Sequence, residues 1–404
     1  MAGTDFKDVP SELKRNFRLL CTFNFFNAAS FTLPIYILFG THYLHITYLE
    51  AGSFFLTSWF LSLALDFIGG TMADKYGRKR TFTIGLLLQI LGVLPFIFIK
   101  NYPLLLAAAI LTGFGMALYT NTVSALFYEQ AIELKRKAYY QHANPTMLSF
   151  SYLGRIMASI VGGIAFKIHP TLPYILTASS LALGLVAGLG TKFSATVEAH
   201  MEHKSVGGVS GAALRVFTSN PALLKFILVV GLLCAWGDYA FTYYQPYFIQ
   251  HGATSTTLGY LFAAISLFSA IGTLAMRKLP NRLSAQRINS ITLSGVILTG
   301  LLLAVLHLPA AYGAPLVMAL ISGLTLPNLS LYVNKFAPNR IRSSVLSIAT
   351  TAMGIGSGVG IFTALRLVGH VSQHTILLVL TVGAVATLLL NTGFNFRDQA
   401  SAKA

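Results

Sequence analysis

The chain has 404 residues, of which 55% are hydrophobic and only 10% are charged, and its formal net charge is +16. A soluble protein carries roughly a quarter charged residues, so this composition excludes a string of soluble domains. The mean hydropathy of +0.68 instead indicates that most of the chain faces lipid.

Apolar segments follow one another along the whole chain, and each can cross a bilayer as a helix, which needs about 20 residues. Twelve spans are predicted, over residues 19–40, 47–73, 81–99, 103–128, 145–167, 172–190, 222–248, 256–276, 288–306, 314–334, 344–366 and 374–394. The residues before the first segment are polar and show no cleavage site, so we expect that segment to be retained as a span.

The loop between the second and third spans carries a motif, Gly70-Thr-Met-Ala-Asp74-Lys75-Tyr-Gly77-Arg78-Lys79. It resembles the loop signature of the major facilitator superfamily, G-x-x-x-D-[RK]-x-G-R-[RK]. The resemblance implies an all-α membrane protein with twelve transmembrane helices in two pseudo-symmetric six-helix bundles. It also implies a conformational lock on the cytoplasmic side. The lock residues would be Gly70, Asp74, Gly77, Arg78, Lys79 and, at the end of the fourth span, Glu129. The other interpretation is a basic topogenic loop with a turn glycine.

The fifth span contains a glycine pattern, Gly154-Arg-Ile-Met-Ala158-Ser159-Ile-Val-Gly162-Gly163. It is similar to the motif G-x-x-x-G-P-x-x-G-G of drug:proton antiporters, although Ala158 and Ser159 replace Gly-Pro. Close packing of small residues between membrane helices explains the same pattern, so both interpretations stay open. Four glycines in the eleventh span, Gly354, Gly356, Gly358 and Gly360, likewise indicate a packing face or a hinge.

One long polar stretch, residues 191–221, separates six spans from six. We therefore predict an N-terminal bundle (1–190), a cytoplasmic linker (191–221) and a C-terminal bundle (222–404). After the eighth span the chain has a degenerate copy of the first loop motif, Gly272-Thr-Leu-Ala-Met276-Arg277-Lys278, in which Met276 stands at the position of Asp74. Such a copy is expected where two halves repeat one structure.

Basic residues gather on one side of this topology. Of the 28 lysines and arginines, all but Lys100, Arg155, Lys167 and Arg366 lie in the tails, the linker or loops of that side or, for Lys225, at the linker end of the seventh span. This is the positive-inside pattern, which predicts a multi-pass protein of the cytoplasmic (inner) membrane with both termini in the cytoplasm. The positive charge therefore indicates contact with anionic lipid headgroups and gives no support for nucleic acid binding.

Two carboxyls lie deep within spans, Asp238 in the seventh and Asp66 in the second, and Arg155 is the comparably deep base. A charge near the bilayer centre costs at least about 2.5–3.5 kcal/mol, so each needs a partner, a wet cavity or a proton. We predict Asp238 first and Asp66 second as proton-coupling residues. The alternative for Asp66 is a structural ion pair with Arg155.

In the family that the loop motif resembles, the first, fourth, seventh and tenth spans line a central cavity. By that resemblance the polar and aromatic residues of these spans, with Arg155, are the candidate substrate contacts. They are Asn24, Asn27, Tyr119, Asn121, Arg155, Trp236, Tyr239, Tyr243, Asn328 and Tyr332.

Other chemistry receives little support. Cys21 and Cys234 are isolated within apolar segments, and the ten histidines lie in loops or at span ends, so neither a metal site nor a cofactor is expected. There is no phosphate-binding loop motif and no histidine–aspartate pair typical of a lipid acyltransferase.

The sequence therefore predicts a monomeric secondary transporter and not an enzyme, with a small amphipathic molecule and protons as its partners. Proton-coupled efflux by an antiporter of the multidrug type is the first hypothesis. Proton-coupled uptake of a metabolite or metal chelate is the second, and a membrane-embedded enzyme or receptor is a remote third.

Overall fold

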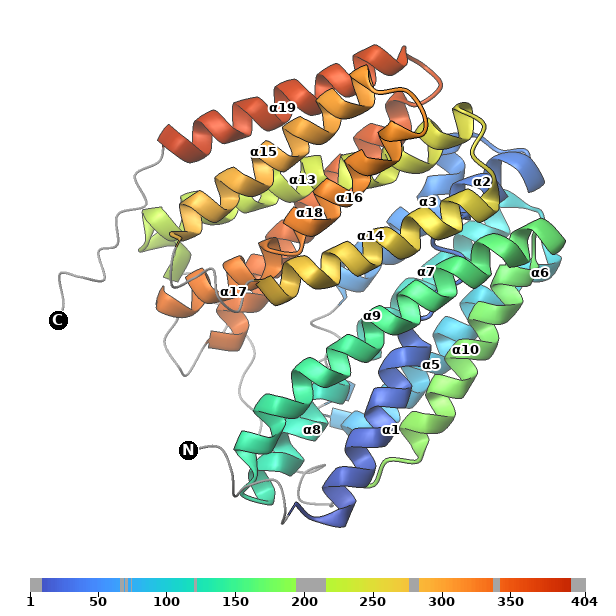
Figure 1. Cartoon of the computed structure of the whole chain (residues 1–404). Coiled ribbons are helices and arrows are strands. Elements are labelled where there is room, and N and C mark those ends of the chain that lie inside the picture. Colours follow the sequence, from blue (N-terminus) through green and yellow to red (C-terminus); the bar gives the residue numbers. More distant parts are fainter. Residues whose placement is uncertain are drawn as a thin grey trace. The chain divides into compact units, whose positions relative to one another are not determined.

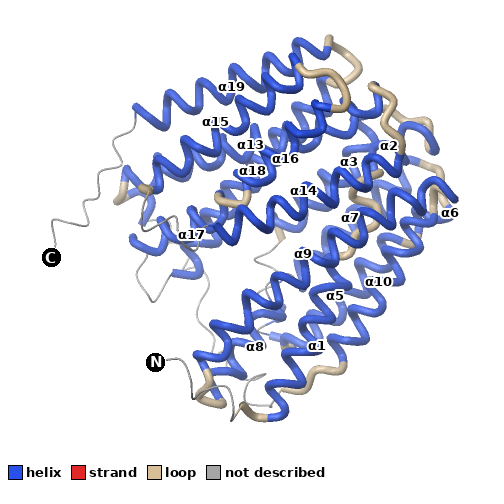
Figure 2. The backbone as a smooth tube through the Cα atoms, viewed as in Figure 1, coloured by secondary structure: helices blue, strands red, loops and turns tan. Residues whose placement is uncertain are grey.

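The computed structural model describes residues 9–65, 69, 72–73, 75–119, 122–193, 216–275, 283–336 and 342–393, and these ranges contain helices and loops but no strand (Figure 2). Contacts divide the chain into two compact units. The first is Met1–Glu202 with Thr254–Ala263, and the second is His203–Ala253 with Ala264–Ala404. The predicted bundle and linker boundaries remain predictions, because residues 194–215 lie outside the described part.

The helices lie at the predicted spans (Figure 1), although those of the first and fifth spans begin eight residues earlier than predicted. Those before the linker are α1 (Ser11–Ala28), α2 (Tyr36–Leu38), η1 (Phe39–Tyr43), α3 (Tyr48–Ala64), α5 (Arg78–Val93), α6 (Pro95–Phe98), α7 (Tyr102–Tyr119), α8 (Thr122–Glu133), α9 (Lys137–Ile168) and α10 (Leu172–Leu189). Those after it are α13 (Pro221–Gln250), α14 (Ser255–Ala275), α15 (Ala285–Val305), η3 (Ala310–Tyr312), α16 (Gly313–Ser322), α17 (Thr325–Phe336), α18 (Arg342–Leu367) and α19 (Gln373–Gly393).

Ten helices of the described part are long and apolar enough to cross a membrane. The two other predicted spans are α1 with α2 and η1, which is interrupted, and α3, whose predicted range runs into residues outside the described part. The all-helical membrane fold predicted from the sequence is therefore confirmed, and the twelve-span count is consistent with it.

The first predicted span, 19–40, is not one continuous helix. The regular α-helix of α1 ends at Ala28 and α2 starts at Tyr36, with Pro34 between them. Proline lacks an N–H and clashes with the preceding turn, so it interrupts a helix. Hydroxyl groups of α10 bind the backbone here: Ser180 donates to the Phe26 carbonyl over 2.8 Å, and Thr177 accepts from the Phe31 N–H over 3.1 Å. Breaks in a membrane helix persist when neighbouring side chains bind the freed backbone in this way.

The tenth predicted span, 314–334, is also broken. Helix α16 ends at Ser322 and α17 starts at Thr325, so Gly323 and Leu324 form a short non-helical connection. The Thr273 hydroxyl of α14 donates to the Gly323 carbonyl over 3.3 Å. Pro327, the third residue of α17, lacks the N–H that would bind the Gly323 carbonyl, so this break is also caused by a proline.

The two units repeat the same helix pairings. In the first unit α1 packs on α9 and α10, and α5 packs on α7 and α10. In the second unit α13 packs on α18 and α19, and α15 packs on α16 and α19, as Figure 1 shows for α15 and α19. The pairs are equivalent when each span of the first half is matched to the span six positions later in the chain. The internal repeat inferred from the degenerate copy of the loop motif thus extends to the packing of the helices.

Glycines permit the closest approaches in both units. Gly154 and Gly162 of α9 lie against the backbone of residues 25 and 31 in the α1 region, so a side chain at either would meet a carbonyl. Gly163 lies against Gly259, which belongs to the first unit. The glycine pattern of the fifth span is therefore used for close helix packing, which is the second of its two interpretations.

Candidate substrate cavity

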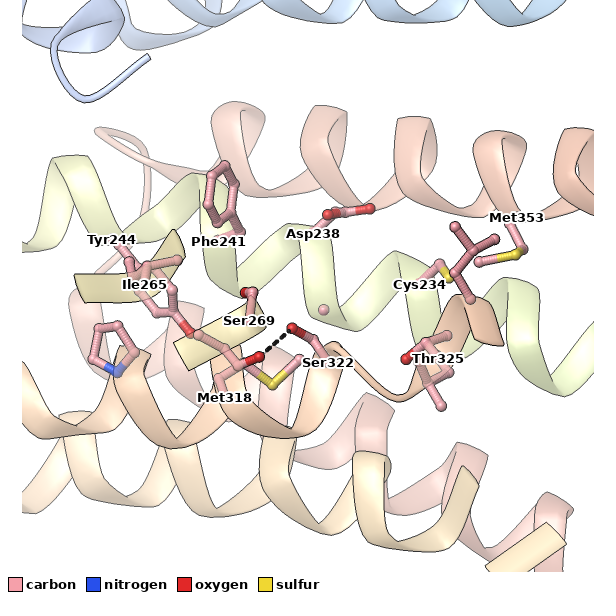
Figure 3. Close-up of a pocket in the computed structure, with 15 residues that line it drawn as sticks. Cys234, Asp238, Phe241, Tyr244, Ile265, Ser269, Met318, Ser322, Thr325 and Met353 are labelled. Atoms are coloured by element: carbon pink, nitrogen blue, oxygen red, sulfur yellow. Dashed lines mark hydrogen bonds between the residues drawn. The ribbon is translucent and has the colours of Figure 1, made fainter. Parts of the chain in front are cut away.

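A cavity of about 330 Å³ lies inside the second unit (Figure 3). One face of α13 forms a wall of it, because residues three or four apart on a helix share a face. The other walls come from α14, α16, α17 and α18. The lining residues are Leu233, Cys234, Gly237, Asp238, Phe241, Tyr244, Ile265, Ser269, Pro315, Met318, Ala319, Ser322, Thr325, Leu326 and Met353.

Asp238 is the charged residue of this lining. Its side chain is half-buried and is within hydrogen-bonding reach of the Ser357 hydroxyl on α18. Within the described part of the chain, no lysine or arginine forms an ion pair with it. A carboxylate in a membrane span without a cationic partner is costly, so this group is suited to hold a proton or a cationic ligand.

The aromatic residues of α13 predicted for the cavity lie elsewhere. The Trp236 indole donates to the Thr387 hydroxyl over 3.0 Å, and the Tyr239 hydroxyl donates to the Ile376 carbonyl over 3.0 Å, both on α19. Tyr243 is fully buried, with its ring 5.8 Å from that of Tyr247. These three residues recur on a face of α13 different from that of Asp238. The sequence shows two polar and aromatic faces on this helix but not which one borders the cavity.

The residues predicted from the tenth span are also structural in this conformation. The Asn328 amide donates to the Asn289 side chain over 2.8 Å and to the Ala285 carbonyl over 3.1 Å, which ties α17 to α15. The Tyr332 ring stacks on Phe226 with 3.9 Å between centroids. Thr325 and Leu326, at the other end of α17, line the cavity instead.

Sequence reasoning missed Phe241, Tyr244, Ser269, Ser322 and Thr325. Phe241 and Cys234 could have been found, because they stand three and four residues from Asp238 on one helix face. The residues of α14, α16 and α17 could not, because only the folded unit brings them to α13.

The first unit contains a second polar cluster, and it gathers several predicted cavity residues. The Tyr119 hydroxyl of α7 is within hydrogen-bonding reach of Asn27 on α1 and of Gln89 on α5, and Arg155 is near enough to interact with it electrostatically. Asn24 lies 3.5 Å from the Ser151 hydroxyl of α9. The Arg155 side chain is exposed and lies 5.9 Å from the Tyr152 ring centroid. Asn121 and Asp66 lie outside the described residues, so the pairing of Asp66 with Arg155 stays a prediction.

Of the predicted cytoplasmic lock, the structure describes Gly77, Arg78 and Lys79. Gly77 has a φ of +90°, a conformation that favours glycine, and it precedes α5. Arg78 is only 6% exposed. The Lys79 ammonium donates to the carbonyls of Leu189 and Thr191 over 3.0 and 2.7 Å, so it caps the end of α10. Gly70, Asp74 and the side chain of Glu129 lie outside the described part, and the lock itself remains a prediction.

The family model of the Major Facilitator Superfamily matches residues 19–361. An uncharacterized MFS-type transporter, YxaM of Bacillus subtilis (strain 168), is 22% identical over 304 residues, which are 73% of this chain and 74% of that protein.

Two solved structures illustrate the shared fold. A variant of the nucleoside transporter NupG superimposes with a TM-score of 0.82 at 13% identity, covering 96% of this chain and 100% of that one. A D-xylose–proton symporter gives 0.70 at 13% identity, covering 95% and 98%. At these identities the likeness shows the fold alone.

Proposed function

Because the chain belongs to the major facilitator superfamily, we propose that it moves a small amphipathic molecule out of the cytoplasm by proton-coupled alternating access. It is a multi-pass membrane transporter rather than an enzyme. The substrate, the direction and the coupling ion are the proposed parts.

The observation that carries the proposal is Asp238 in its cavity. A carboxyl that is costly to ionise can be neutralised by a proton or by the cationic group of a ligand, and one occupant excludes the other. Exchange follows from this exclusion: a proton displaces the ligand on one side of the membrane and is displaced on the other. The cavity wall of Phe241 and Tyr244 offers the apolar and aromatic surface that an amphipathic ligand needs.

A vesicle assay tests the direction. We expect right-side-out vesicles that contain the transporter to expel a preloaded cationic amphipathic dye when the outside is made acidic, and to stop when the gradient is collapsed. Vesicles without the protein are the control. If the same gradient drives accumulation inside, the protein is a proton-coupled importer of the kind that the sequence left as its second hypothesis.

The transport cycle gives a second expectation. We expect residues 1–190 to rock against residues 222–404, since the two units repeat one another and a polar linker joins them. Spin labels on opposite loops of each face should report distances that open on one face while they close on the other when substrate is added. Distances that stay constant on both faces under all conditions would contradict this cycle.

A further inference from the structure

Arg155 is a cation at the middle of a membrane span. The span covers Ala143–Ile168 of α9, and Arg155 lies about 18 Å along the helix axis from either end of it. An arginine side chain is too short to reach the headgroup region from that depth, so snorkelling cannot relieve its charge. The guanidinium therefore needs water or an opposite charge at its own level in the membrane.

Arg155 lies on a face of α9 that is turned away from lipid. Large exposed apolar side chains form a stripe along this helix, as expected of a lipid-facing surface: Phe150, Leu153, Met157, Val161, Ile164 and Ile168. Leu153 and Met157 stand two residues either side of Arg155, so a rotation of about 100° per residue places them on the opposite face. Ser159, one turn after Arg155, is 1% exposed and packs on Gly259 of α14. The exposed Arg155 side chain is therefore accessible from the protein side of the helix.

The groups around the guanidinium are polar but uncharged. The Tyr152 ring centroid lies 5.9 Å from it, and Tyr119 of α7 is near enough to interact with it electrostatically. One turn before Arg155, the Ser151 hydroxyl donates to Asn24 Oδ1 of the adjoining α1 over 3.5 Å. Within the described part of the chain, no carboxylate forms an ion pair with Arg155. These neighbours make the surroundings polar and leave the positive charge uncompensated.

The chemistry of this cluster favours one kind of ligand group. The N–H donors of a guanidinium form a planar fork that matches the two oxygens of a carboxylate. One guanidinium balances one negative charge, so a carboxylate fits it better than a doubly charged phosphate. The Tyr152 ring offers an aromatic surface beside the charge for the apolar part of such a ligand.

We propose that Arg155 binds the carboxylate of a small organic acid at the middle of the membrane. The uncharged side chains of Tyr119, Tyr152 and Asn24 surround the bound group. The inference rests on the proposed function and deepens it, because it gives the transported amphipathic molecule an acidic group.

Two matched probes test the carboxylate site by equilibrium binding to the purified protein with no gradient: 3-phenylpropionate and 3-phenylpropanamide. They have the same size and shape and differ in charge. We expect phenylpropionate to bind at least tenfold more tightly, because only its carboxylate forms charge-assisted hydrogen bonds with the guanidinium. Equal affinities, or no binding by either probe, would overturn the proposal.

Substitutions at Arg155 locate the bound group. Arg155→Gln should weaken phenylpropionate about tenfold and leave the amide unchanged, which also shows that the variant is folded. Arg155→Lys keeps the charge but not the fork, so its affinity should lie between those of Arg155→Gln and the wild type. Lys167→Gln, which removes an exposed cation from the same helix, is the matched control and should bind phenylpropionate as the wild type does.

Two results would assign Arg155 another role. Equal affinities for phenylpropionate in Arg155→Gln and the wild type would remove Arg155 from the site. Binding that appears only in Asp66→Asn would show that Asp66 occupies the guanidinium as a structural ion pair, and would also overturn the proposal.

The failure of this inference is distinct from a failure of the proposed function. Carboxylate binding that depends on Arg155, without any gradient-driven flux, would contradict the proton-coupled efflux and keep the site. Gradient-driven expulsion of the cationic dye by a protein that does not distinguish the two probes would keep the efflux and overturn the site.

Discussion

Replacing Asp238 with asparagine is expected to abolish uphill transport driven by a pH gradient while downhill exchange of substrate continues. Asparagine keeps the size and the hydrogen-bonding capacity of the side chain, including its reach to Ser357, but it cannot exchange a proton. The ligand and the proton then no longer compete for one group, so a pH gradient can no longer drive the substrate uphill.

The measurement is concentrative transport in proteoliposomes, with and without a gradient, set beside counterflow at equal pH. Glu50→Gln is a matched loss of carboxylate. Glu50 accepts the Thr47 N–H over 2.9 Å at the start of α3, and glutamine can do the same. That control should transport as the wild type does.

The Asp238 variant should also remain folded, because removing a carboxyl from membrane depth takes away a desolvation cost of about 2.5–3.5 kcal/mol. If Asp238→Asn concentrates substrate as well as the wild type and Asp66→Asn does not, proton coupling belongs to the second span. If neither change matters, the transporter is not driven by protons.

Gly360→Ala is expected to destabilise the second unit strongly. Its added Cβ would meet the carbonyl oxygen of Ala235 on α13, and backbone cannot move aside as a flexible side chain can. Gly356, one turn earlier on α18, lies against Gly231 in the same way. Overpacking of this kind costs about 1–3 kcal/mol, and α18 also carries Ser357, the partner of Asp238.

Thermal unfolding of the purified variant gives the readout, with Gly313→Ala as the control. Gly313 begins α16, and a Cβ there would meet nothing within 4 Å. That control should be neutral or slightly stabilising, because alanine favours helix over glycine by up to about 1 kcal/mol. Equal melting temperatures for the Gly360 variant and the wild type would show that α13 and α18 can separate at little cost, as a hinge face would.

Some of the site could be predicted from residue type and spacing. Asp238 is conspicuous in an apolar segment because an ionisable group at that depth is expensive, whatever the packing around it. Asn27 and Tyr119 were expected to line a cavity only through the resemblance to the family, and the structure brings them together in the first unit. The inference about Asp238 depends only on the cost of placing a charge in lipid, which can be judged from the sequence.

The remaining predictions depended on the direction of each side chain as well as on its depth in the membrane. Trp236 and Tyr239 are as polar and aromatic as a cavity residue should be, but they face α19, where they find a hydroxyl and a carbonyl. Asn328 meets Asn289 on α15, while Thr325, one turn before it, borders the cavity. A rotation of about 100° per residue separates the two faces of α13, whereas Thr325 and Asn328 differ mainly in their position along α17. A sequence does not say which face or which turn has which neighbour.

The sequence by itself determined that this chain is a helical membrane transporter of the major facilitator type, because hydrophobic length, basic loops and the motif from Gly70 to Lys79 are local properties. The tertiary structure decided which hydroxyls of α10 and α14 bind the backbone at the breaks near Pro34 and Pro327, and which face of α13 meets the cavity. It also decided that Thr325 lies with Asp238 on the cavity wall. Those features arise from close approach between helices far apart in the chain. Such approach depends on which glycine or hydroxyl lies opposite which carbonyl, and that is settled only when the helices pack.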